Sequence, residues 1–247
     1  IVILHTNDMH ASMANMPRLA AYKQEMEEKY ETVILVSAGD IFSGNPAVDF
    51  HKEKGYPMID LMNQAGYEIS TLGNHEFDYG QEILTTRMRQ ADFEFICANM
   101  DASEADMPQP APYAVIEKGK IKLLFLGLIE LGNNGVPSTH PDKVQNITFS
   151  DPVQKAEEFI HLHGLYNAFI GLTHLGYETD VELAKTYHQF DAIIGGHSHT
   201  LVEEPQEHNG VLLTQAGDDV NYVGKLVLTF KDGELTERSA SLVNLRD

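Results

Sequence analysis

Five separate apolar stretches of this chain are each followed directly by Asp, Asn or His residues. The clearest is 67–72, which is rich in β-branched and aliphatic side chains and leads into Asn74, His75 and Asp78. Such a stretch predicts a strand, and a helical pattern follows it at 81–91. Open α/β sheets bind their ligands where a strand, a polar turn and a helix follow one another. This repeated pattern is the strongest constraint on the fold.

The other four polar clusters also follow predicted strands. The strands are predicted at 1–6, 31–38, 168–172 and 191–194, and they lead into Asp8 and His10, Asp40, His174, and His197 and His199 respectively. If the strands share one direction, all five clusters lie along one edge of a sheet. A single histidine at a strand end is most simply a hydrogen-bonded polar residue, whereas five clusters together indicate a shared ligand.

The residue types in these clusters favour divalent metal ions. Three Asp or Asn side chains and five His side chains would be costly to bury without partners. Imidazole suits zinc, iron, nickel or copper, while the carboxylates and the amide also admit manganese. His5 lies within the first predicted strand and is expected in the core rather than at the site.

The length of 247 residues fits one large domain or two small ones. No internal repeat, low-complexity tract or linker divides the chain, so a single domain over 1–247 is expected. No apolar stretch is long enough for a membrane span. Residues 1–4 indicate a buried strand rather than a signal peptide, so the chain is expected to be trimmed, which leaves its compartment open. Cys97 is the only cysteine, which excludes an internal disulfide and a thiolate zinc site.

The formal net charge of −20 comes from 37 acidic and 17 basic residues. Such a balance argues against a basic patch for nucleic-acid binding. An anionic substrate would need positive charge at the site itself, and bound cations can supply it. The sequence has no Gly-x-Ser-x-Gly nucleophile motif, and 217–225 misses the P-loop spacing by two residues.

The remaining elements complete the expected α/β pattern. Helices are predicted from Pro17, over 57–65, from Pro152 and over about 180–188, with a hairpin at 113–117 and 122–129 and three final strands at 210–215, 222–231 and 235–245. Residues 101–112 and 131–145 are expected to be loops, and loops of that length are often functional or mobile.

Taken together, the motifs resemble those of the calcineurin-like metallophosphoesterases, and in particular of their 5′-nucleotidase branch. The motifs are Asn7-Asp8-Met9-His10, Gly39-Asp40, Gly73-Asn74-His75-Glu76, Thr173-His174 and Gly195-Gly196-His197-Ser198-His199. They span residues 7–199, which is most of the chain. The resemblance implies an α/β fold, a four-layer αββα sandwich with two mixed sheets.

The resemblance also implies a site with two divalent metal ions, either zinc, manganese or iron. One ion would be held by Asp8, His10, Asp40 and His199, and the other by Asp40, Asn74, His174 and His197. His75 and Asp78 match the catalytic pair of the family. Two such ions can activate a bridging hydroxide as the nucleophile and hold a phosphoryl group for in-line attack.

The expected activity is that of a metal-dependent phosphoester hydrolase of the 5′-nucleotidase or 2′,3′-cyclic-nucleotide phosphodiesterase type. Alternatives are hydrolysis of another phosphate, pyrophosphate or sulfur ester, or a metal-binding module that is inactive without a partner domain. Longer members of the branch carry a C-terminal nucleotide-binding domain, so this chain is expected to be the catalytic domain alone. The resemblance further implies a periplasmic or other extracytoplasmic location.

Overall fold

The computed structural model describes residues 1–246, whose longer strands form two six-stranded sheets. The first sheet has the order β14-β13-β1-β2-β3-β4, and its strands are β1 (Val2–Thr6), β2 (Val33–Ser37), β3 (Ile69–Thr71), β4 (Glu94–Ile96), β13 (Tyr222–Lys231) and β14 (Glu234–Asn244). The second has the order β11-β12-β10-β9-β7-β6, and its strands are β6 (Tyr113–Lys118), β7 (Ile121–Ile129), β9 (Ala168–His174), β10 (Ala192–Ile194), β11 (Gln206–His208) and β12 (Val211–Thr214). A small pair joins β5 (Met100–Asp101) and β8 (Thr148–Phe149).

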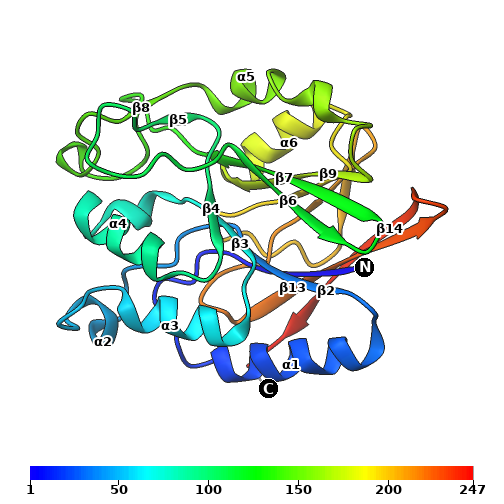
Figure 1. Ribbon diagram of the computed structural model, residues 1–247, viewed down its shortest axis with the longest axis horizontal. Helices are drawn as coiled ribbons and strands as arrows, with labels where there is room; N and C mark the ends of the chain where they lie inside the picture. Colours follow the sequence, from blue (N-terminus) through cyan, green and yellow to red (C-terminus); the bar gives the residue numbers. More distant parts are fainter. Residues whose placement is uncertain (247) are drawn as a thin grey trace.

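Helices cover the outer face of each sheet. The α-helices are α1 (Met16–Lys29), α2 (Pro46–Asp49), α3 (Tyr56–Ala65), α4 (Gln81–Gln90), α5 (Pro152–Glu157) and α6 (Tyr177–Thr186), and the short 3-10 helices are η1 (Asn74–Phe77), η2 (Pro141–Lys143) and η3 (Ile160–Leu162). Figure 1 shows α1, α2 and α3 along the lower side, α5 and α6 along the upper side, and the strands between them. None of the helices in residues 1–246 is both long and apolar enough to cross a membrane.

Three apolar cores separate the four layers. Because side chains alternate along a strand, Ile3 of β1 packs between the two sheets while Leu4 packs against the helices of the first sheet. Leu124 and Phe169 of the second sheet pack in the third core, on the side of α6. The structure therefore confirms the αββα sandwich with two mixed sheets.

The five polar clusters lie on two sheets, so the prediction of one shared sheet edge is wrong. β1, β2 and β3 are parallel neighbours in the first sheet, whereas β9 and β10 are parallel neighbours in the second. A strand buried on both faces is apolar whether both faces are covered by helices, as in a single sheet, or one face is covered by a second sheet. The pattern of strands alone could not decide between them.

The start of α6 and the presence of β11 both differ from the prediction. α6 begins at Tyr177, three residues before the predicted start, and Asp180 is a buried residue inside it that accepts a hydrogen bond from Thr173 Oγ1 at 2.6 Å. The C-terminal region contains a fourth strand, β11, which the sequence did not predict. Its residues Gln206 and Glu207 are polar and exposed, so β11 carries no apolar pattern.

Candidate metal centre

The carboxyl ends of five parallel strands meet where the two sheets face each other. β1, β2 and β3 come from the first sheet, and β9 and β10 come from the second. Just after three of these strands, β1, β2 and β10, residues with side chains take positive φ angles, which such residues adopt rarely. Residues with such angles include Asp8, His10, Asp40, His197 and His199. Strained backbone of this kind clusters at functional sites.

Three overlapping groups of side chains bring possible ligand atoms within 4.8 Å of one another. The groups are Asp8, His10 and His199; His10, Asp40 and His75; and Asp40, His174 and His197. Asn74 adjoins the third group, because its Oδ1 lies 3.0 Å from His197 Nδ1. The structure therefore brings together every residue that the sequence suggested as a ligand, with His75 beside them.

The buried His174 shows that these residues fit a bound cation. Its Nδ1 lies 2.7 Å from the carbonyl oxygen of Ala38, which can only accept, so Nδ1 carries the hydrogen. In the neutral ring Nε2 is then a lone pair; it has no hydrogen-bond partner in residues 1–246 and lies 3.0 Å from Asp40 Oδ2. A lone pair and a carboxylate repel at that distance unless positive charge lies between them. A proton or a divalent metal satisfies both groups.

The pKa values of this pair show the same demand for positive charge. Burial alone would lower the pKa of His174, but Asp40 and Asp8 outweigh it and raise that pKa to about 10. Burial alone would raise the pKa of Asp40, but His174 and His75 hold it well below its usual range. Both side chains are almost completely buried, so solvent does little to screen the two charges.

The group of possible ligands formed by Asp8, His10 and His199 extends from the interior to the solvent. Asp8 is fully buried, and its two oxygens accept hydrogen bonds from the backbone nitrogen of His197 at 3.1 and 3.0 Å. Asp8 Oδ1 lies 3.4 Å from His199 Nε2, which lies 3.0 Å from His10 Nε2. The His199 side chain is 43% exposed, and its Nδ1 lies 3.4 Å from Asp218 Oδ2. This end of the centre is therefore open to solvent.

Glu76 fixes the position of Asp40. Its buried carboxylate accepts hydrogen bonds from the backbone nitrogens of Asp40 at 2.9 Å, Ile41 at 2.6 Å and Gly73 at 2.5 Å. Burial, followed by the negative charge of Asp40, raises the pKa of Glu76 to about 7. A side chain at Gly73 would place its Cβ 2.2 Å from Asp40 Oδ1, so only glycine fits there. Glu76 thereby ties the turn after β2 to the turn after β3.

His75 and Asp78 form the hydrogen-bonded pair that the motif predicted. Nδ1 of His75 lies 2.7 Å from Asp78 Oδ2, and this hydrogen bond is the main reason why the pKa of His75 rises to about 9. Ser43 Oγ lies 3.1 Å from the same ring nitrogen and donates to Asp78 Oδ2 at 2.5 Å. Tyr79 Oη accepts from the backbone nitrogen of Ser43 at 3.2 Å and donates to Asp49. The His75 side chain is 37% exposed, so it remains accessible to a substrate.

Several residues that organise the site were not identified from the sequence. Gln215 Oε1 accepts from the backbone nitrogen of Thr200 at 2.5 Å, while its Nε2 donates to the Gly196 carbonyl at 3.0 Å. Gln215 and Asp218 follow β12, which runs parallel to β10. A polar cluster after an apolar strand is the same signal that identified the other five sites. The role of Glu76 had no such signal, because its three partners come from two different turns.

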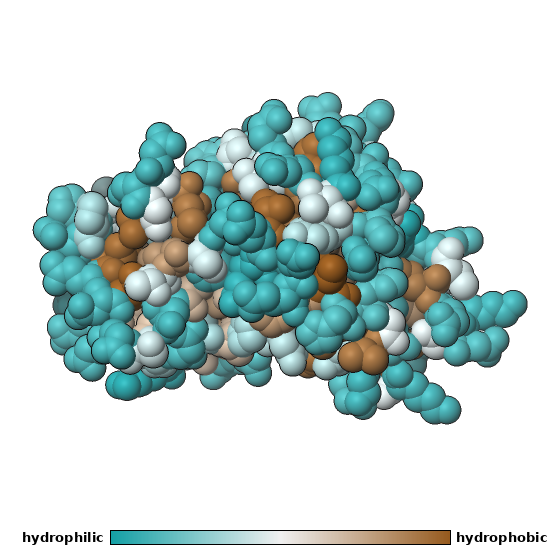
Figure 2. Space-filling view, turned by 90° about the horizontal axis from the view of Figure 1, so that it is seen from above, coloured by the Kyte–Doolittle hydropathy of each residue, from teal (hydrophilic) through white to brown (hydrophobic). Residues whose placement is uncertain are grey.

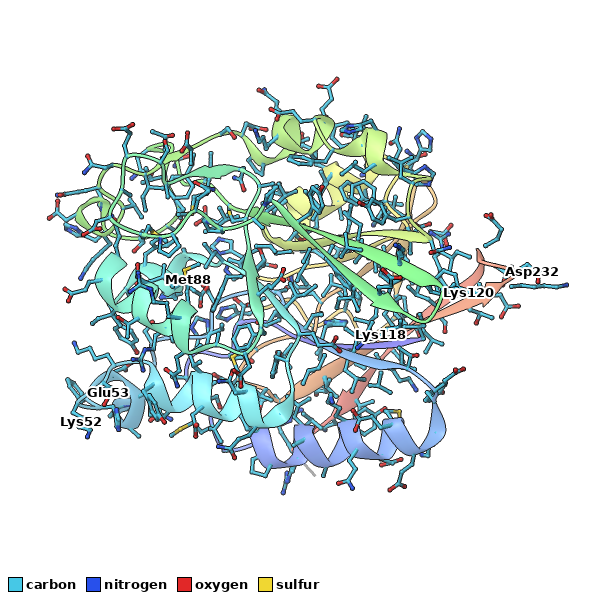
Figure 3. All side chains as sticks on the ribbon, in the orientation of Figure 1. Lys52, Glu53, Met88, Lys118, Lys120 and Asp232 are labelled. Atoms are coloured by element: carbon cyan, nitrogen blue, oxygen red, sulfur yellow. The ribbon has the colours of Figure 1, made fainter. Side chains whose placement is uncertain are left out.

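The basic side chains of the β6–β7 turn lie away from this centre. Figure 3 labels Lys118 and Lys120 at that turn and Asp232 at the β13–β14 turn. The β6–β7 turn precedes β7, whereas Glu130 follows β7 and its backbone nitrogen donates to the His174 carbonyl at 2.8 Å. These two lysines therefore lie at the opposite end of β7 from the site.

The sequence model of the calcineurin-like phosphoesterase family matches residues 1–201. The chain belongs to the calcineurin-like phosphoesterase family. The family match contains all five motifs, and the structure brings their side chains together at one site.

Three of the similar proteins are named as 5′-nucleotidases or nucleotide phosphoesterases. The chain is 28% identical over 280 residues to the trifunctional nucleotide phosphoesterase protein YfkN of Bacillus subtilis, covering 98% of this chain and 19% of that protein. It is 28% identical over 291 residues to a 5′-nucleotidase of Vibrio parahaemolyticus, covering 98% of this chain and 50% of the relative. The solved structure of a 5′-nucleotidase precursor from Thermus thermophilus superimposes with a TM-score of 0.86 at 28% identity, over 99% of this chain and 54% of that one. The chain therefore spans about half or less of the length of these three proteins.

Proposed function

We propose that this chain is a dinuclear metal-dependent phosphoester hydrolase of the nucleotidase type. The observation that supports it most strongly is the shared position of Asp40, which belongs to two of the three groups of ligand atoms. One ion would be held by Asp8, His10, Asp40 and His199, and the second by Asp40, Asn74, His174 and His197. Two bound divalent ions supply Lewis-acid stabilisation of the phosphoryl oxygens and lower the pKa of a bound water.

The charges of the ligands keep such a site positive. Asp8 and Asp40 are the two carboxylates among the proposed ligands, and their two negative charges only partly offset four positive charges from two divalent ions. The chain has a net charge of −20, but the charge at the two-ion site would be positive. An anionic phosphoester can therefore bind at that site.

His75 is the proposed catalytic residue outside the ligand set. Its ring is partly exposed beside His10 and Asp40, where it can donate a hydrogen bond to the phosphoryl oxygens or a proton to the leaving alkoxide. Asp78 orients the ring through Nδ1, and Ser43 holds both members of the pair. No protein nucleophile is required in this scheme.

Nucleotides are the proposed substrate class, because the relatives named above are nucleotidases or nucleotide phosphoesterases. Base recognition by aromatic stacking has little support near the site. Phe77 is fully buried, and the Tyr79 ring lies 5.5 Å from the Phe42 ring with Lys54 Nζ 5.7 Å from its centroid. We propose that residues 1–247 act as one catalytic domain and that a separate nucleotide-binding domain supplies most of the base specificity.

Turnover of 4-nitrophenyl phosphate by protein supplied with Mn²⁺ tests the reaction class. Hydrolysis that a chelator abolishes and Mn²⁺ restores is expected, whereas no turnover with both sites loaded would favour a binding module. The ratio of kcat/KM values among AMP, UMP and glycerol phosphate tests the substrate proposal. Poor discrimination is expected; a preference above about 10³-fold for one nucleotide would show that this chain has its own base pocket.

A further inference from the structure

A cavity of about 580 Å³ opens beside the proposed metal centre. His197 lines it directly, and Ser138, another lining residue, accepts a hydrogen bond from Asn74 Nδ2 at 3.2 Å. The other walls come from residues 130–133, the start of α5 and one face of α6. Figure 2 looks onto the α5 side of the molecule, where most of the visible residues are hydrophilic. A substrate bound at the metal centre can therefore extend into a polar cavity on its His197 side.

The lining of this cavity is acidic. It includes the carboxylates of Glu130, Asp151 and Glu182, and no lysine or arginine is among the lining residues of the described chain. Oδ1 of Asp151 caps α5 by accepting from the backbone nitrogen of Gln154 at 2.8 Å. A positive metal centre would thus lie next to a cavity of negative charge. The phosphoryl group of a substrate would bind in positive surroundings and its alcohol part in negative ones.

Glu130 is the best-positioned carboxylate of this cavity. The residue is only 6% exposed, and its Oε1 accepts a hydrogen bond from the backbone nitrogen of Ser138 at 2.5 Å. Oε2 has no hydrogen-bond partner within residues 1–246 but is not sealed from solvent, so it faces the cavity that Glu130 lines. A buried carboxylate with one oxygen fixed and the other free is positioned to accept a hydrogen bond or to bind a cation.

We propose that this cavity receives the alcohol part of the substrate and selects alcohols with amine or hydroxyl groups against alcohols with a second anionic group. The proposal rests on the phosphohydrolase function described above. Amines and hydroxyls can donate to Glu130 and Glu182, whereas a carboxylate or a second phosphate meets like charges. The favoured substrates are therefore phosphomonoesters of amino alcohols or of neutral polyols, and a nucleoside monophosphate belongs to the second kind because the sugar of the nucleoside is a neutral polyol.

This placement also assigns a role to His75. His197, at the cavity, shares a ligand group with His174 and Asp40, whereas His75 shares a different group with His10 and Asp40. An alcohol in the cavity lies on the His197 side, so His75 acts on the phosphoryl oxygens rather than on the leaving oxygen.

Three esters of nearly equal size test the selection. They are 2-aminoethyl phosphate, 2-hydroxyethyl phosphate and 2-phosphoglycolate, whose alcohol parts are cationic, neutral and anionic. With Mn²⁺-loaded protein, kcat/KM is expected to fall in that order, by about 10- to 100-fold between the first and the last. A flat or reversed order together with normal turnover of 4-nitrophenyl phosphate would overturn this proposal alone. No turnover of any ester would instead count against the proposed function.

Binding of the matching phosphonates gives a readout without turnover. The probes are 2-aminoethylphosphonate, 2-hydroxyethylphosphonate and phosphonoacetate, with dissociation constants measured by ligand-observed NMR. Glu130→Gln keeps an oxygen acceptor for the Ser138 amide, and both Glu130→Gln and Glu182→Gln are expected to reduce the preference for the cation by about 10-fold. Glu178→Gln is the matched control, because Glu178 lies one turn from Glu182 on α6 but does not line the cavity. Equal preference in Glu130→Gln and Glu178→Gln would show that the cavity does not hold the alcohol.

Discussion

His5 and His174 are both completely buried, yet the two regions around them favour opposite charge states. His5 lies in β1 between the two sheets, where burial lowers its pKa to about 3. His174 lies at the end of β9, where Asp40 and Asp8 outweigh the effect of burial and raise its pKa to about 10. Equal burial therefore gives a neutral ring in one region and a demand for a cation in the other.

The difference comes from the partners that each region offers. His5 Nε2 lies 3.4 Å from Thr214 Oγ1, and its Nδ1 has no hydrogen-bond partner in the described chain. The ring packs so closely on Gly224 that a Cβ there would lie 1.9 Å from Nε2. His174 instead has a backbone carbonyl at one nitrogen and a carboxylate at the other. The space between the sheets accommodates a histidine as a neutral side chain, whereas the strand ends are arranged for positive charge.

Asp40→Asn would remove the main difference between the surroundings of His174 and those of His5. We expect the largest effect from this variant. The change removes the carboxylate that is shared by both proposed ions, so both should be lost and turnover should fall to background. Wild-type protein with metal at 100 times its dissociation constant gains about 2.7 kcal/mol in the free energy of unfolding, and the variant should not. Elemental analysis and melting temperature with and without Mn²⁺ measure both effects.

Asp232→Asn is the matched control for that experiment. Asp232 lies at the β13–β14 turn (Figure 3) with a φ of 54°, a conformation that asparagine tolerates well. The Asp232→Asn protein should keep the metal content and the Mn²⁺-dependent melting temperature of the wild type. If Asp40→Asn also kept two metals per chain, the shared-ligand assignment would be wrong.

His75→Ala tests a second histidine near Asp40, one whose side chain is partly exposed rather than buried like that of His174. It is not a proposed ligand, so the metals should stay while kcat falls by roughly 10²–10⁴-fold. The loss should be similar for 4-nitrophenyl phosphate and for an alkyl phosphate if His75 acts on the phosphoryl oxygens. A much larger loss on the alkyl ester would instead show that it protonates the leaving oxygen.

Asp78→Asn provides a graded comparison with the preceding variant. Asp78 contacts His75 rather than a proposed metal ligand, so Asp78→Asn is expected to lower kcat by about 10- to 100-fold with the metal content unchanged. An unchanged kcat in both variants would leave the ligand residues as the only participants in catalysis.

The smallest effect is expected at His5, as a pH dependence of stability. Its pKa of about 3 in the folded chain lies below the ordinary value of 6.5, so protonation favours the unfolded chain. The contribution of His5 to the free energy of unfolding is therefore fully present above pH 6.5. It falls by about 1.4 kcal/mol per pH unit as the pH decreases from 6.5 toward 3. Urea unfolding of the metal-free protein at pH 7, 6 and 5 measures this slope.

His5→Leu should remove that part of the slope, since leucine cannot take up a proton. His188→Gln changes an exposed histidine and should leave the slope as in the wild type. Identical slopes in wild type and His5→Leu would mean that His5 accepts a proton without unfolding, and the contrast with His174 would then fail.

The sequence by itself predicted which side chains lie together at the candidate centre. The motifs around Asp8, Asp40, Asn74, His174 and His197 each combine a strand with the polar turn after it, and both are local features. Parallel strands carry their carboxyl ends to the same side, which explains the grouping within each sheet but not the meeting of the two sheets. The family resemblance added the assignment of roles and the expectation of two sheets.

Only the tertiary structure decided how those residues are held and what surrounds them. Glu76 aligns two turns through three backbone nitrogens, and Glu130 faces a cavity built from two helices and a loop. In the sequence, His5 lies within a predicted strand and His174 follows one, but this difference does not give the charge of either ring. Their charge depends on carboxylates that are distant along the chain, and electrostatic energy depends on distance in space. Within residues 1–246 the fold brings Asp40 to His174 and no carboxylate to His5, which agrees with a proposed ligand in one case and a core residue in the other.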